Sequence, residues 1–332
     1  MSTLIGRFES MDIVHSSSKL STTSIHDTEE NAGERPIEKE ELQFSAQHAA
    51  KEYQIFETLS SSSRVVGSIP ENRGKFDEKE YPQSIIGLNI VKSSDYDQHQ
   101  YESAKIRIAQ DPKIITSHSV FVIDCSGSMK KADVEAHRSR ADAVSYAVAT
   151  EFIAKRLHNP SSGVSHFDVV TVIEMREGAS IVFYKEPLSW VFYNKFIEQA
   201  KKTRSSKPSS PTEYKNLLSL VHETVIEIDH KNLALLLVFF FGTSNLLKYR
   251  YKIRNLFLIG YEYQERLTFG FVGYSSFGTD SHDMMDLENL VSYLEMEGIT
   301  GEFCYPDLED SISSFLAKLS SMLLTKKRAL QR

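Results

Sequence analysis

A short series of acidic and hydroxyl side chains follows an apolar segment of the chain. Asp124, Ser126 and Ser128 occupy alternating positions at and after the end of the apolar run SVFVID at 119–124. In a tight turn, one carboxylate and two hydroxyls at this spacing can all point inward, and Gly127 lets the turn fold closely. These hard oxygen ligands suit Mg²⁺ or Mn²⁺, with water molecules completing an octahedron. The turn is therefore the first candidate for a functional site.

Apolar strands that alternate with helices after residue 112 must position this turn. We expect strands at 119–124, 166–175, 179–185, 233–241, 267–272 and 301–305, and helices at 137–158, 188–202, 213–228, 283–297 and 307–327. The short turn at Glu177-Gly178 predicts a hairpin, which makes the third strand an antiparallel edge. The alternation predicts an α/β fold with a doubly wound, mostly parallel six-stranded sheet and helices on both faces. Ligands bind such sheets at the carboxyl ends of the strands, where Asp124 lies.

The first 112 residues differ in composition from the rest. Residues 1–44 are rich in Ser, Thr and acidic side chains and poor in apolar ones. Such a segment buries too little apolar surface to offset its chain entropy, so we expect a disordered tail. We expect 45–112 to be a linker with flanking strands at 84–91 and 104–109, the second of which shows an alternating apolar pattern.

Composition excludes several classes of protein. The 332 residues include 38 basic and 45 acidic side chains, a net charge of −7, which argues against a nucleic-acid partner. Two cysteines cannot form the disulfide framework of a small secreted protein and favour a reducing compartment. The most apolar run, 233–241, has about half the length that a bilayer requires. We expect a soluble, cytoplasmic protein without a membrane partner, and a nuclear location stays open.

The run VFVIDCSGSM at 120–129 resembles the motif of von Willebrand factor A (vWA, or integrin I-like) domains. In that family, Asp-x-Ser-x-Ser follows the first buried strand and forms the metal-ion-dependent adhesion site (MIDAS). The likeness covers about residues 117–324, and we expect the domain at 113–328. The resemblance implies that Mg²⁺ is held by Asp124, Ser126, Ser128 and Thr212. Thr212, from the segment SSPTEY, can also be the N-cap of the helix that we expect from residue 213.

The sequence departs from the family's pattern after the fourth strand. The family has a second aspartate there, whereas this chain has Phe241, followed by Gly-Thr-Ser-Asn. The resemblance therefore implies a degenerate site that lacks one carboxylate and binds Mg²⁺ weakly. An Asp or Glu from a protein partner would add the missing charge if it completed the coordination. We expect the rim that contacts this partner to include Gly127, Met129, Thr243 and Ser244.

Three functions remain open. The first is an intracellular protein-binding adaptor whose ligand engages the carboxyl edge of the sheet, with or without Mg²⁺. The second is a metal-free vWA subunit of a larger complex. The third is a phosphatase or hydrolase that uses Asp124, but Ser126 stands where such phosphatases carry their second aspartate. No motif designates a histidine base for Ser126 or Ser128 either, so we expect a binding protein and not an enzyme.

Overall fold

The computed structural model describes only part of the chain. The described residues are 83–159, 163–176, 178–205, 217–228, 230–242, 258–274, 291–292, 294–296, 298–305 and 312–332. The chain divides into two units, Met1–Arg64 and Val65–Arg332, and all described residues belong to the second. The tail predicted at 1–44 lies outside them. Each helix of the described part is too short or too polar to cross a bilayer.

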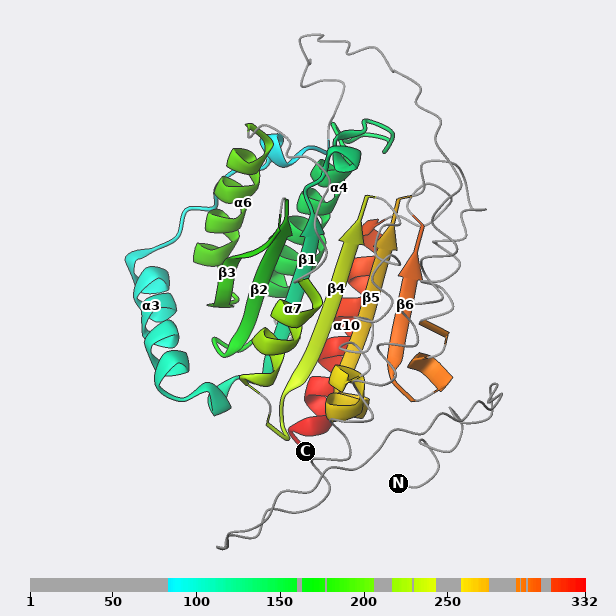
Figure 1. The fold of residues 1–332 in the computed structure, drawn as a ribbon. Helices are drawn as coiled ribbons and strands as arrows, with labels where there is room; N and C mark the ends of the chain where they lie inside the picture. The colour runs from blue at the N-terminus through cyan, green and yellow to red at the C-terminus, as the bar shows by residue number, and fades with distance from the viewer. Residues whose placement is uncertain are drawn as a thin grey trace, which may run out of the picture. The chain divides into compact units, whose positions relative to one another are not determined.

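Six strands form a single sheet in the order β3-β2-β1-β4-β5-β6 (Figure 1). The strands are β1 (Ser117–Asp124), β2 (Asp168–Met175), β3 (Ala179–Pro187), β4 (Ala234–Phe241), β5 (Leu267–Gly273) and β6 (Thr300–Cys304). All neighbouring strands are parallel except β3, which pairs antiparallel with β2. The predicted α/β fold with an antiparallel edge strand is confirmed.

The two central strands, β1 and β4, explain the apolar runs in the sequence. All eight residues of each strand are buried, because helices cover both faces of the sheet. The chain reaches β2 on one side of β1 and later β4 on the other, so the strand order reverses at β1. Ile123 pairs with Phe240, which aligns the carboxyl ends of the two strands. In open α/β sheets, ligands bind at this kind of reversal point.

Two helical layers enclose the sheet. The helices are α4 (Arg140–Ala147), the π-helical segment η4 (Val148–Ala154), α5 (Lys155–His158), α6 (Trp190–Ser205), α7 (Leu217–Ile226) and α10 (Ile312–Leu330). Figure 1 shows α7 in front of the sheet, and α4 and α10 behind it. The core behind the sheet joins α4, η4, α6 and α10 to Phe121 and Phe240, whereas the core in front joins α7 to Phe239 and Phe241.

The strands expected at 84–91 and 104–109 are wrong. The first segment contains the short 3-10 helix η1 (Ile85–Gly87), and the second belongs to the α-helix α3 (Asp95–Gln110). Helical spacing places Tyr101, Ala104 and Ile108 on the buried side of α3, while Ile106 is 58% exposed. The alternation of Ile106 and Ile108 therefore reflects one buried and one exposed helical position.

Candidate functional site

The turn after β1 brings Asp124, Ser126 and Ser128 together. The Ser126 backbone N–H donates to Asp124 Oδ1 at 2.7 Å, and the Ser126 hydroxyl donates to Asp124 Oδ2 at 3.0 Å. The two serine hydroxyl oxygens lie 2.8 Å apart, within hydrogen-bonding distance. Asp124 is fully buried and Ser126 nearly so, whereas Ser128 is half-buried and Gly127 is exposed. We call these three oxygen-bearing side chains, Asp124, Ser126 and Ser128, the oxygen cradle.

The oxygen cradle fits Mg²⁺ in donor type and spacing. In an octahedral site with oxygens about 2.1 Å from the ion, neighbouring ligand oxygens are about 3.0 Å apart. The 3.0 Å and 2.8 Å separations around the Ser126 hydroxyl match adjacent positions of such an octahedron. The charge is low, because Asp124 is the one carboxylate of the cradle. In the described part of the chain, no group of three or more His, Cys, Asp or Glu side chains can hold a metal ion.

Phe241 lies where the resemblance places a second aspartate. Because Ile123 pairs with Phe240, the next residues along the strands, Asp124 and Phe241, lie side by side on one face of the sheet. The Phe241 ring is 1% exposed and stacks on Phe239 with ring centroids 5.7 Å apart. An apolar ring therefore occupies the position from which β4 would supply the second carboxylate.

Gly242, the residue after β4, completes the surroundings of Asp124. Its backbone N–H donates to Asp124 Oδ2 at 2.9 Å. A Cβ atom at this position would lie 2.3 Å from Ser128 Oγ and 2.8 Å from Met129 Cγ. A Cβ atom fits there only if the side chains of Ser128 and Met129 shift, so glycine allows the close approach. Sequence reasoning missed this residue, and its one signal was a glycine directly after an apolar strand.

Arg140, the first residue of α4, is a second residue that sequence reasoning missed. Its guanidinium is 1% exposed and binds both carboxylate oxygens of Asp133, at 2.8 and 2.5 Å. Its Nη1 donates to the Gly242 carbonyl at 3.1 Å, and its Cζ lies 5.0 Å from the ring centroid of Tyr274. Arg140 thus ties the start of α4 to the ends of β4 and β5.

The other expected residues have different outcomes. Thr212, Thr243 and Ser244 lie outside the described residues. Met129, expected at the rim, is 1% exposed and belongs to the core behind the sheet. Gly127 is exposed at the turn, as a rim residue must be.

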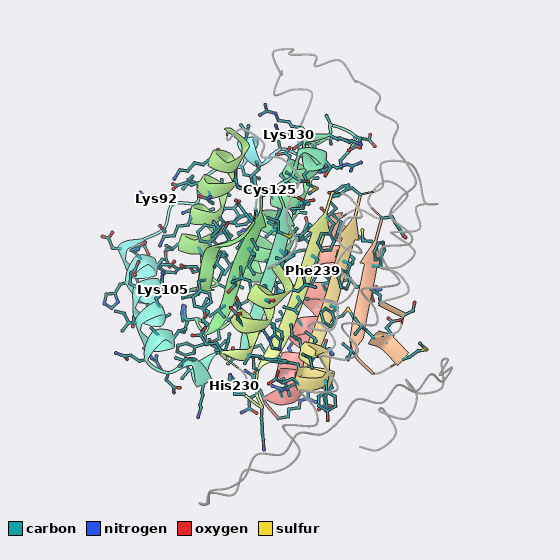
Figure 2. The ribbon with its side chains drawn as sticks, in the orientation of Figure 1. Lys92, Lys105, Cys125, Lys130, His230 and Phe239 are labelled. Carbon is teal, nitrogen blue, oxygen red and sulfur yellow. The ribbon has the colours of Figure 1, made fainter. Side chains whose placement is uncertain are left out.

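A cleft of about 420 Å³, including space open to solvent, lies beside the turn. It is lined by Ile123, Cys125, Ala141, Ser145, Val172, Glu174, Phe183, Phe196, Gln199 and Ala200. Burial, together with the nearby negative charge of Glu174, raises the pKa of the Cys125 thiol well above its usual value. The thiol is therefore protonated at neutral pH and is a poor nucleophile. Figure 2 shows Cys125 and Lys130 at one end of the sheet and His230 at the other.

No family model matches this sequence, and no curated protein matches it. The SpRpn10 VWA domain is a similar solved structure, 11% identical over 62% of this chain and 93% of that domain, with a TM-score of 0.41. The PilB minor pilin from Streptococcus sanguinis is 12% identical over 65% of this chain and 62% of that chain, with a TM-score of 0.43. The von Willebrand factor type A from Catenulispora acidiphila is 13% identical over 64% of this chain and 42% of that chain, with a TM-score of 0.40.

The strand order, the antiparallel edge strand and the Asp-x-Ser-x-Ser turn after β1 occur together in this chain. This combination agrees with the fold that the resemblance in the sequence implies. The chain spans nearly all of the first solved domain named above and less than two thirds of the other two.

Proposed function

We propose that this chain is an intracellular adaptor that binds a protein partner at the carboxyl edge of its vWA sheet. The observation that carries this proposal is the oxygen cradle at the point where the strand order reverses. Asp124 and Ser126 are buried there, while the exposed Gly127 and the half-buried Ser128 reach the surface. A polar group on a partner can therefore meet the cradle from outside through Ser128.

The adaptor would hold Mg²⁺ weakly at this cradle, through Asp124, Ser126 and Ser128. The bound ion would supply positive charge for a carboxylate of the partner. A single carboxylate in the cradle accounts for low affinity in the absence of the partner, since one negative charge leaves the divalent ion under-neutralised. Thr212 remains a proposed fourth ligand on the basis of the resemblance.

A metal-free subunit of a larger complex is the second candidate, and one observation favours it. Asp124 already accepts hydrogen bonds from the backbone N–H groups of Ser126 and Gly242 and from the Ser126 hydroxyl. These donors stabilise the buried carboxylate without an ion. A hydrolase has less support, because the Ser126 hydroxyl binds Asp124 and the Ser128 hydroxyl. In the described part of the chain, neither serine has a histidine base as a hydrogen-bond partner.

Affinity capture from native extract with the full chain tests the adaptor function. We expect a partner that the wild type and Asp95→Ala retain and that Asp124→Ala loses, since Asp95 is an exposed acid on α3 far in sequence from the cradle. Loss of the same partner in EDTA supports the Mg²⁺-dependent form, and retention in EDTA supports the metal-free form. If folded Asp124→Ala retains every partner of the wild type, the carboxyl edge is not the binding surface.

Calorimetric titration with Mg²⁺ and Mn²⁺ tests the metal separately. We expect weak binding by the wild type, none by Asp124→Ala, and tighter binding by Phe241→Asp, which adds a carboxylate beside Asp124. Because the Phe241 ring is buried, circular dichroism must first show that the variant is folded. A folded Phe241→Asp protein that binds no more tightly than the wild type would show that the missing ligand belongs elsewhere.

A further inference from the structure

Arg140 places a buried positive charge next to Gly242, the residue whose backbone N–H donates to Asp124. The Gly242 N–H points to Asp124 Oδ2, and the Gly242 carbonyl accepts from Arg140 Nη1. One glycine therefore separates the carboxylate of the cradle from a guanidinium that is 1% exposed. The chain has a fixed cation beside the cradle and an aromatic ring, Phe241, where the resemblance places an acid.

The pairing of Arg140 with Asp133 does not cancel this charge at the cradle. The guanidinium is buried, whereas the Asp133 side chain is 42% exposed. Water screens the exposed carboxylate more strongly than the buried guanidinium, so the positive charge dominates on the inner side of the pair. Arg140 also stands at the N-terminus of α4, where the helix dipole adds partial positive charge.

We propose that Arg140 sets the cation affinity of the oxygen cradle: its guanidinium, held beside Gly242, opposes a divalent ion there. This inference rests on the proposed metal site. It explains why the cradle can have ligands of the right type and spacing and still bind Mg²⁺ weakly without a partner. A partner's carboxylate would add the negative charge that offsets Arg140, so metal and partner would bind together.

The test measures Mn²⁺ binding to the full chain by the loss of the free-ion electron paramagnetic resonance signal. For Arg140→Gln we expect a dissociation constant about ten-fold lower than that of the wild type, because a nearby positive charge is removed. Lys130→Gln is the matched control, since it removes an exposed cation at the same end of the sheet (Figure 2). It is expected to change the constant less than about two-fold, because water screens its charge.

A double variant tests whether the position of the Arg140 charge or the net charge of the protein determines the Mn²⁺ affinity. Asp133→Asn combined with Arg140→Gln removes one charge of each sign, and it also avoids leaving Asp133 without its partner. We expect it to bind Mn²⁺ more tightly than the wild type, by about three-fold. Tight binding by the single variant that disappears in the double variant would attribute the effect to net charge and overturn the proposal. Adding Asp124→Ala must abolish the gain in either background.

The remaining outcomes distinguish this inference from the metal site itself. Folded wild type, Arg140→Gln and Lys130→Gln proteins with equal, measurable Mn²⁺ binding would overturn the role of Arg140 and leave the metal site standing. No binding by any of these folded proteins at millimolar Mn²⁺ would overturn both the metal site and the inference. Thermal denaturation followed by circular dichroism establishes that each variant is folded. If Arg140→Gln alone is unfolded, the double variant is compared with the wild type instead.

Discussion

Two buried carboxylates lie at opposite ends of the sheet, and the donors described for them differ in charge. Asp168, at the start of β2, accepts from Lys327 at 2.8 Å and from Arg156 at 3.3 Å, and both cations are almost fully buried. The hydroxyls of Thr116 and Ser117 also donate to it, each at 2.7 Å. The donors to Asp124 described above are instead neutral backbone and hydroxyl groups.

The difference shows how one fold uses a buried acid in two ways. Burial alone would raise the pKa of Asp168, but Arg156 and Lys327 lower it below its usual value. Arg156 belongs to α5 and Lys327 to α10, so the ion pairs of Asp168 connect these two helices to the sheet. The three donors described for Asp124 are neutral, and they stabilise its charge without cancelling it. The second arrangement leaves a carboxylate that can still attract a cation.

The largest expected effect is at the ion cluster. Asp168→Ala leaves the buried cations Arg156 and Lys327 without their shared carboxylate, so we expect a loss of about 3–5 kcal/mol in the free energy of unfolding. Urea denaturation measures this loss. Asp95→Ala, at an exposed position on α3, is the control and should change stability by less than about 0.5 kcal/mol. Equal losses in the free energy of unfolding for the two variants would contradict a structural role for Asp168.

A smaller loss is expected at the cradle. Asp124→Ala leaves neutral donors from Ser126 and Gly242 unpaired, so we expect destabilisation by about 1–3 kcal/mol. The same urea denaturation gives the comparison with Asp168→Ala. If Asp124→Ala destabilises the protein more than Asp168→Ala does, the contrast between a structural and a binding carboxylate is wrong.

The packing of Gly242 gives a third prediction. A methyl group in Gly242→Ala would overlap Ser128 Oγ and Met129 Cγ, so we expect a loss of about 1–3 kcal/mol together with weaker Mn²⁺ binding. Gly127→Ala is a matched control, because a Cβ atom there has no neighbour within 4 Å. Thermal denaturation and Mn²⁺ titration of both variants test this. Similar behaviour of the two alanine variants would contradict the close approach of Gly242 to the cradle.

The smallest effect is confined to acidic pH. Because the pKa of Asp168 is lowered in the folded chain, its ionisation stabilises the fold fully above its unfolded pKa of about 3.9. This contribution is lost as the pH falls through the lower, folded-state pKa. We expect the free energy of unfolding of the wild type to fall more steeply below about pH 4 than that of Asp168→Asn. Parallel curves from urea denaturation at a series of pH values would contradict the cation pairing.

Sequence reasoning succeeded where a pattern is local. Complete burial of β1 and β4 leaves continuous apolar runs, and the hairpin of β2 and β3 follows from a short turn. The turn from Asp124 to Ser128 was visible because its three side chains are close in sequence. The strand predicted at 104–109 was wrong because Ile106 is an exposed apolar residue, which gave this part of a helix the alternating pattern of a strand.

The residues that the sequence did not reveal depend on contacts between distant segments. Gly242 reaches Asp124 across 118 positions, and Arg140 reaches Gly242 across 102. Neither contact leaves a local pattern, because it exists only once the register of β1 with β4 aligns their ends. A buried arginine at the start of a helix also looks like an ordinary surface residue in the sequence.

The π-helical segment η4 affects the direction of the side chains on either side of it. The helix is continuous from Arg140 to His158, and both Arg140 and Arg156 are buried. At about 100° per residue, an unbroken α-helix would turn these two side chains about 160° apart. One extra residue taken up by a π turn reduces this to about 60°. A single helix can thereby aim a guanidinium inward at each of its ends. Deleting one residue from 148–154 would leave a regular α-helix with 15 steps between the two arginines and would keep this angle at about 60°.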